Sequence, residues 1–214
     1  MAITFANVIS NARVIYSDAV SPYRIEDATL LSFAKDGIVE IATLDPSQFE
    51  VKGTINCIAG QCLQQLPNPE RAIYLIDVYE SVVAGNRKAI YECDLETLRR
   101  YRPTYTTDTA AQADNWMRQP SREGEKRDET RLLVYPQAPS GQALYASWTE
   151  YPDMTAYAVG DTIPVSEDYA VALEWYIAFR AEQLNDEAQV RQRAAENYAK
   201  FIGLMGQGKT DRSA

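Results

Sequence analysis

The spacing of the apolar residues changes along the chain, and this change limits the possible folds more than any other feature. Residues 5–16, 24–44 and 166–206 place apolar side chains three and four positions apart, as helices with one buried face do. Residues 49–94 and 132–152 are richer in alternating, β-branched and aromatic residues, which is typical of strands. The sequence therefore predicts an α+β fold with a β-rich middle between two helical ends.

The N-terminal helices have clear boundary signals. Thr4 precedes the first helical pattern, and a threonine side chain can cap a helix by accepting a hydrogen bond from its first turn. Ser21-Pro22 predicts the start of the second helix, because proline fits a first helical turn. Asp45-Pro46 predicts its end, because the residue before a proline avoids the helical region.

The C-terminal helices are the clearest elements of the pattern. The helix that Ser166 is expected to cap has almost no polar face, which predicts a central position in a bundle. The next helix carries one apolar stripe: Val190, Ala194, Tyr198, Phe201, Ile202 and Met205. Gly206 and Gly208 are expected to stop it, since glycine commonly ends helices. Residues 207–214 then form a short polar tail.

The middle of the chain shows several strand signals. Residues 72–83 and 87–94 form a predicted hairpin around the turn sequence AGNR. Asp94 is expected to cap a short helix that ends before Pro103. The strand-like sequences RLLVYP and QALYASWTEYP follow within residues 131–152, joined by the turn-forming QAPSG.

The predicted domains follow from these elements. Residues 1–48 and 166–206 form a helical bundle, and residues 49–165 form an inserted β-rich domain. Within the inserted domain, residues 102–130 are polar and include the charged run SREGEKRDET. We expect a long surface loop there, either an interaction surface or simply a solvated excursion.

Composition excludes several classes of function. The chain has no histidine, which removes His-dependent catalytic triads and His-ligated metal sites. Its three cysteines, Cys57, Cys62 and Cys93, do not follow a zinc or thioredoxin spacing, so we expect reduced and mostly buried thiols. The GQGKT sequence near the end resembles a phosphate-binding loop but follows a predicted helix instead of a strand. No metal, cofactor or catalytic residue is predicted.

Charge and hydropathy limit the partners. The formal net charge of −9 disfavours nonspecific binding to the phosphates of DNA. The first residues lack the basic segment and unbroken apolar run of a signal peptide, and no stretch approaches the roughly 20 apolar residues that span a membrane. We therefore expect no membrane partner.

Two groups of side chains leave other functions open. Asp77, Glu80, Glu92 and Asp94 lie on or beside the predicted hairpin and can be imagined as acid and base of a glycan-acting enzyme, or as part of a carbohydrate-binding module. Tyr101, Tyr105 and Trp116 lie in or beside the polar loop, where a core role is harder to argue. Aromatic residues are enriched in protein interfaces, so these three are candidates for a subunit or tail interface.

Four phrases of the sequence resemble one known family over residues 5–206. They are GQCLQQLPNPERAIYLIDVYE at 60–80, AIYECDLETLRRYRP at 89–103, LLVYPQAPSGQALYASWTEYP with its "V-x-P-x-x-x-G" hairpin at 132–152, and a C-terminal set. That set is Asp168, Tyr169, Leu173, Tyr176, Arg180, Ala181, Tyr198 and Phe201. Their order and spacing resemble the head-to-tail adaptor, or connector, proteins of tailed bacteriophages. The chain departs from the family at Tyr105, where a tryptophan is frequent, and before Leu132, where an Asp-Pro phrase is missing.

The resemblance implies a structural virion protein and not an enzyme. Such proteins bind the portal protein as a ring, usually of twelve copies, and carry the tail nozzle or tail tube, while DNA passes only as cargo. The implied location is the neck of the virion, after assembly in the host cytoplasm. The C-terminal segment of the family commonly docks on the portal, so the expected docking residues are Phe201, Ile202, Leu204, Met205, Lys209 and Arg212.

Overall fold

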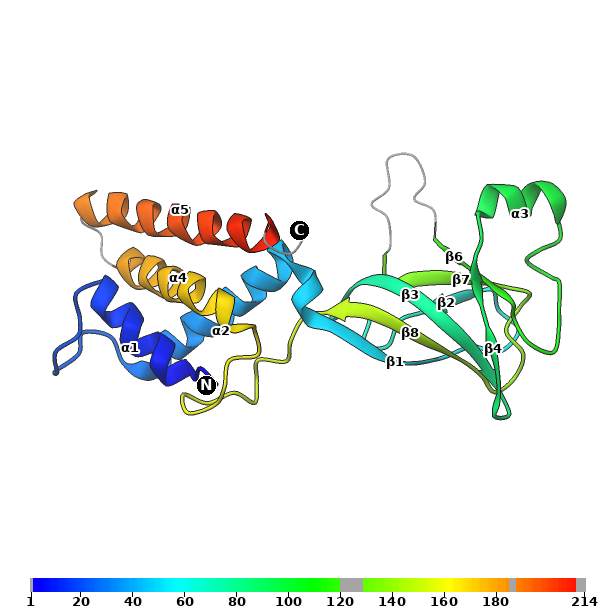
Figure 1. Cartoon of the computed structure of the whole chain (residues 1–214), viewed down its shortest axis with the longest axis horizontal. Helices are drawn as coiled ribbons and strands as arrows, with labels where there is room; N and C mark the ends of the chain where they lie inside the picture. Colours follow the sequence, from blue (N-terminus) through cyan, green and yellow to red (C-terminus); the bar gives the residue numbers. More distant parts are fainter. Residues whose placement is uncertain (1, 120–128, 185–187, 211–214) are drawn as a thin grey trace. The chain divides into compact units, whose positions relative to one another are not determined.

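The computed structural model describes residues 2–119, 129–184 and 188–210, and these form helices and two β-sheets (Figure 1). The α+β class predicted from the sequence is confirmed. The chain divides into a helical unit, Met1–Gln48 with Pro152–Ala214, and a β unit, Phe49–Tyr151. Residues 152–165, assigned to the β-rich segment from the sequence, thus group with the helices. Within the described part of the chain, no helix combines the length and the apolar character needed to cross a membrane.

The helical unit is built around one central helix. It contains α1 (Phe5–Ile15), α2 (Asp27–Leu44), the short turn η2 (Glu167–Tyr169), α4 (Ala170–Gln183) and α5 (Ala188–Thr210). Helix α4 packs against α1, α2 and α5, as its nearly continuous apolar surface predicts. Its buried residues are Ala170, Ala172, Leu173, Tyr176, Ile177, Ala178, Ala181 and Glu182.

The first two helices begin differently from each other. Thr4 caps α1 as predicted, because its hydroxyl accepts a hydrogen bond from the Asn7 N–H at 3.3 Å. Helix α2 begins at Asp27, so the start predicted at Ser21-Pro22 is wrong. The residues before Asp27 are instead drawn into contacts with the buried side chain of Arg13, described below. The predicted end before Asp45-Pro46 is confirmed.

Helix α5 is longer than its sequence predicts. It continues through Gly206 and Gly208 to Thr210, so the predicted stop at these glycines is wrong. A glycine in a helix costs about 1 kcal/mol relative to alanine but does not forbid the helix. It ends a helix mainly when it takes a left-handed conformation, and Gly203 and Gly206 have no positive φ.

The described residues of the β unit form two four-stranded sheets and one short helix. The first sheet has the order β1 (Glu50–Asn56), β8 (Gln142–Glu150), β3 (Ala72–Val83) and β4 (Asn86–Ala89). The second has the order β2 (Leu63–Gln65), β7 (Arg131–Tyr135), β6 (Asn115–Arg118) and β5 (Tyr91–Glu92). The turn η1 (Pro46–Phe49) precedes β1, and α3 (Leu95–Tyr101) follows β5 with Asp94 as its predicted cap.

Strand pairing confirms one predicted hairpin in part, because Asn86–Ala89 pairs with β3 whereas Tyr91–Glu92 belongs to the second sheet, and it corrects another. Strands β3 and β4 pair antiparallel around the turn at Ala84-Gly85. Strands β7 and β8, which are consecutive in the chain, do not form a hairpin because β7 pairs with β2 and β6 while β8 pairs with β1 and β3. Leu132 and Val134 of β7 share one core cluster with Leu144 and Ala146 of β8. Both strands therefore bury their apolar sides in the same core from different sheets.

The predicted surface loop at 102–130 contains a strand and is in part wrong. Strand β6 lies within it and pairs parallel with β5 and antiparallel with β7. Trp116 and Met117 of this strand are each 1% exposed, so adjacent side chains are both buried. A four-residue strand without alternation carries no period that a sequence pattern can reveal. Residues 121–128 of the charged run lie outside the described residues.

Candidate functional site

A buried arginine organises the segment between α1 and α2. Arg13 is only 4% exposed. Its Nη1 lies 2.9 Å from Asp18, and its Nη2 donates to the Ile25 carbonyl at 2.8 Å and to Asp27 at 2.5 Å. A buried charge persists in a fold when it is paired and hydrogen-bonded, so these contacts hold residues 17–27 against α1.

Asp18 is the buried anion of this network. Its side chain is 3% exposed, and it accepts a hydrogen bond from the backbone N–H of Arg24 at 2.9 Å. Burial acts to raise the pKa of the Asp18 carboxyl, but hydrogen bonds from the backbone N–H groups of Arg24 and Ile25 and from Tyr16, together with the charge of Arg13, outweigh burial and leave the pKa lowered. Burial also raises the pKa of the neighbouring Tyr16 hydroxyl to about 12. At neutral pH the aspartate is therefore charged and the tyrosine is not.

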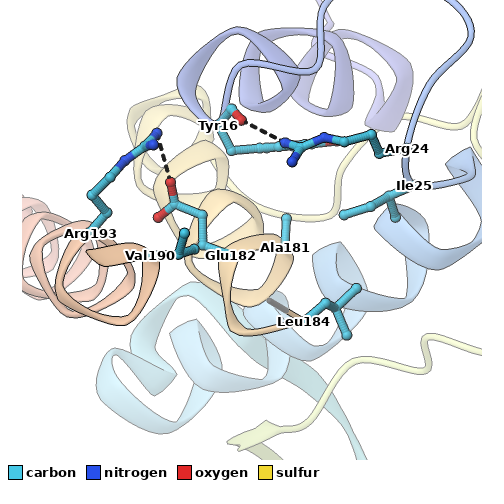
Figure 2. A pocket seen from close by; sticks show the side chains of 8 residues that line it. All are labelled: Tyr16, Arg24, Ile25, Ala181, Glu182, Leu184, Val190 and Arg193. Carbon is cyan, nitrogen blue, oxygen red and sulfur yellow. Dashed lines mark hydrogen bonds and ion pairs between the residues drawn. The ribbon is translucent and has the colours of Figure 1, made fainter. Parts of the chain in front are cut away.

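A cavity of about 250 Å³ lies beside this segment (Figure 2). Its walls come from the α1–α2 segment, the C-terminal end of α4 and the start of α5. We call it the arginine pocket, and its lining residues are Tyr16, Arg24, Ile25, Ala181, Glu182, Leu184, Val190 and Arg193. Figure 2 shows Arg24 and Arg193 held by hydrogen bonds or ion pairs from two different walls.

Each arginine of the pocket is held by a buried partner and keeps an outward side. Arg193 Nη2 lies 3.0 Å from Glu182 Oε1, and Arg24 Nη2 donates to the Tyr16 carbonyl at 3.1 Å while its Nε lies 3.7 Å from Asp18. Glu182 and Asp18 are each 5% exposed, whereas the Arg193 and Arg24 side chains are 51% and 61% exposed. Because a guanidinium has five donors, both arginines can bind a further anion.

Glu182 is the carboxylate at the base of the pocket. Its Oε2 accepts a hydrogen bond from Asn197 Nδ2 at 2.7 Å. Among the described residues its Oε1 has no partner with hydrogen-bonding geometry, and it contacts Arg193 as an ion pair. Burial raises the pKa of the Glu182 carboxyl, and the charge of Arg193 only partly opposes this shift.

We expect the substitution Glu182→Gln to alter how stability depends on pH. A raised pKa means that the folded state holds the proton more tightly than the unfolded chain does. The free energy of unfolding should therefore fall as pH rises from the ordinary glutamate value of 4.5 through the folded pKa. Urea unfolding of the variant across this range should show a weaker fall than wild type.

The matched control is Glu96→Gln on α3, where the glutamate side chain is 77% exposed. This variant should keep the wild-type pH dependence. Superimposable pH profiles for wild type and Glu182→Gln would show that burial of Glu182 does not influence stability.

The expected portal-docking residues are divided between core and surface. Phe201 is fully buried, with its ring centre 5.2 Å from that of Tyr176, and Met205 is 3% exposed. Ile202 is 39% exposed and Leu204 is half-buried, so α5 presents these two outward. Lys209 lies in the last turn of α5, and Arg212 lies outside the described residues.

The three aromatic residues expected at an interface also differ in how exposed they are. Tyr101 is 75% exposed at the end of α3. Tyr105 is half-buried against a small cluster that includes Leu95, Leu98 and Met117. Trp116 is 1% exposed within the core between the sheets. Tyr101 is thus the most accessible of the three.

The four carboxylates considered for catalysis have structural partners. Asp94 caps α3 through the Thr97 N–H at 2.8 Å, and Glu92 lies 3.2 Å from Arg118. Glu80 lies 3.3 Å from Arg87, and Asp77 accepts a hydrogen bond from the N–H of the next residue at 2.8 Å. Each of the four side chains thus has a contact within the β unit.

Sequence reasoning missed Arg13, Arg24, Glu182 and Arg193. A usable signal exists for two of them, because Arg13 lies one turn after Ile9 on the apolar face of its helix and Glu182 lies in the nearly apolar α4. A charged residue on a buried face indicates a buried partner. The exposed arginines carry no comparable signal.

One comparison with known proteins, a match to a family model, agrees with the sequence resemblance. A family model described as SU10 adaptor protein matches residues 3–214. Among solved structures, the chain is similar to one from the neck of an empty GTA particle, with 15% sequence identity and a TM-score of 0.27. That match covers 92% of this chain and 93% of the other. None of the curated proteins matches.

Proposed function

The chain belongs to the SU10 adaptor protein family, and from this membership we propose that it connects the head of a tailed bacteriophage to its tail. In this role it binds the portal protein as a ring of copies, twelve by family resemblance, around a channel for DNA. The family match carries the proposal because it spans residues 3–214 and so includes both units. The role is structural and requires no catalysis.

Charge supports the proposed relation to DNA. A net charge of −9 per copy gives a surface that repels phosphate, so DNA would pass the ring without being held. The proposed partners are the portal protein, further copies of this chain and a tail nozzle or tail tube protein. The proposed location is the virion neck, reached after assembly in the host cytoplasm.

The helical unit is the proposed body of the ring, and the end of α5 is the proposed contact with the portal. Ile202 and Leu204 present apolar surface there. Phe201 and Met205 support this surface from the core.

Electron microscopy of the purified chain mixed with the portal protein of the same phage tests the proposal. We expect a ring of copies stacked on the portal, visible in negative stain. Absence of binding, together with hydrolysis of a glycan by the purified chain, would replace the proposal with the enzymatic alternative.

We expect the substitution Ile202→Ser to weaken portal binding by roughly tenfold, because an apolar contact worth about 1.4 kcal/mol would be lost from the interface. The matched control is Val39→Ser on α2, since Val39 and Ile202 are both 39% exposed. Binding is measured by sedimentation of the portal complex, and both variants should unfold like wild type.

Removal of residues 207–214 should weaken portal binding as well. If both the truncated chain and Ile202→Ser bind the portal at full strength, the portal contact lies elsewhere.

A further inference from the structure

We propose that the arginine pocket binds a second copy of this chain, and that it receives Val171 with the carboxylates beside it. The proposal rests on the proposed function, because it names the surfaces through which neighbouring copies would meet in the ring. It concerns only the helical unit, which contains both surfaces.

The pocket combines apolar walls with two prepared cations. Ile25, Leu184 and Val190 supply apolar surface, and Leu184 is 63% exposed at the edge. Arg24 is already held by the buried Tyr16 carbonyl and Arg193 by an ion pair with the buried Glu182, which reduces the side-chain freedom lost on binding. Guanidinium groups bind carboxylates through paired hydrogen bonds. The fitting occupant is therefore an apolar side chain flanked by carboxylates.

Val171 on α4 meets this description. It is 49% exposed, and acidic residues stand three positions before it, at Asp168, and three positions after it, at Glu174. Residues three apart are neighbours on a helix surface, which places Glu174 beside Val171, and Asp168 lies in the turn η2 directly before α4. Glu174 accepts a hydrogen bond from the neutral side chain of Asn11 at 2.7 Å. We call this surface the Val171 knob.

The other large exposed apolar residues in the described part of the helical unit lack this pattern. They are Val14, Val20, Tyr23, Val39, Leu184 and Ile202. None of them has an acidic residue both three positions before and three positions after it. The acidic patch of the knob ends at Trp175, whose ring carries the Lys200 ammonium at 3.9 Å.

The knob and the pocket of one copy cannot meet each other. Val171 and Glu182 are eleven residues apart on the same helix, which corresponds to about 16 Å at 1.5 Å per residue. The contact must therefore join two copies through two different surfaces. Such a head-to-tail contact, repeated with a closing rotation, generates a ring.

Charge exchange between the two surfaces tests the proposal without disturbing the buried network. Val171→Lys places a cation opposite the two arginines, and Leu184→Glu places an anion opposite the acidic knob. Each substitution alone should weaken association between copies about tenfold, since like charges face each other. The double variant Val171→Lys/Leu184→Glu should recover most of this loss, because each new charge then faces its opposite.

The control is Val14→Lys, which adds a lysine at another exposed valine, 67% exposed on α1. It should associate like wild type. Association is measured in two ways: by sedimentation of the chain alone at rising concentration, and by counting copies on the portal in negative stain. Thermal unfolding should confirm that all variants keep the wild-type fold, as expected for exposed positions.

The remaining outcomes overturn the contact or separate it from the proposed function. Wild-type association by both single variants, or a double variant no better than either single one, would show that knob and pocket do not meet. If the single variants lose portal binding but associate with one another like wild type, the pocket contacts the portal instead of a second copy. The wild-type chain could instead fail to bind the portal while association between copies is lost in the single variants and recovered in the double variant. In that case the contact between copies is supported and the proposed function is wrong.

Discussion

Replacement of Arg13 by alanine is expected to lower the free energy of unfolding by about 3–5 kcal/mol, because it leaves a buried carboxylate without its main cation. The side chains of Arg13 and Asp18 are 4% and 3% exposed. The other cation near Asp18, Arg24, is 3.7 Å away and 61% exposed, so it replaces little of the lost attraction. A loss of this size is a large part of the roughly 5–15 kcal/mol that stabilises a typical domain.

Urea unfolding measures this effect against Arg99→Ala. Arg99 is 47% exposed on α3 and forms a surface ion pair with Glu96 at 3.0 Å, so its removal should change stability by less than about 0.5 kcal/mol. The double variant Arg13→Met/Asp18→Asn removes both charges together. Its loss in free energy of unfolding should therefore be smaller than the sum of the losses for Arg13→Met and Asp18→Asn. Equal stability of Arg13→Ala and Arg99→Ala would mean that the buried network does not hold the fold.

The Arg13 network also bears on the assembly surface. The segment that it holds supplies Tyr16, Arg24 and Ile25 to the arginine pocket. Arg13→Ala should therefore weaken association between copies in addition to stability. The charge-exchange variants separate the two effects, because Val171 and Leu184 lie outside the network.

The second large effect is expected for Trp116→Ala, with a loss of about 3–5 kcal/mol. Trp116 is 1% exposed in the core shared by the two sheets. Arg118, two residues later, lies 5.3 Å over its ring and donates hydrogen bonds to the carbonyls of Leu75 and Ile76 on β3, at 2.6 and 2.7 Å. Strand β6 thus connects the two sheets. The cavity that Trp116→Ala leaves beside this connection should destabilise both sheets.

Tyr101→Ala is the control, since this aromatic side chain is 75% exposed. It should leave the free energy of unfolding within about 0.5 kcal/mol of wild type. If Tyr101 forms the predicted interface, its loss should instead weaken association with a neighbouring copy or tail protein. A Trp116→Ala variant as stable as Tyr101→Ala would contradict the core position of Trp116.

Elements with local signals could be predicted from the sequence. Thr4 and Asp94 start α1 and α3 as expected, because a cap depends on hydrogen bonds within one turn. The β3–β4 hairpin follows from its own turn. The end of α5 could not be predicted in this way, because a glycine only weakens a helix. Other contacts decide whether the helix continues past the glycine.

The sequence alone determined the identity and order of most helices and strands and the α+β class, since periods, caps and turns act within a few residues, and its phrases indicated the family by resemblance. Only the tertiary structure decided that β7 and β8 belong to different sheets, that Trp116 is buried and that an arginine pocket exists. The physical reason is that burial and charge pairing depend on residues far apart in the chain. Glu182 and Arg24, for example, line one cavity although 158 positions separate them.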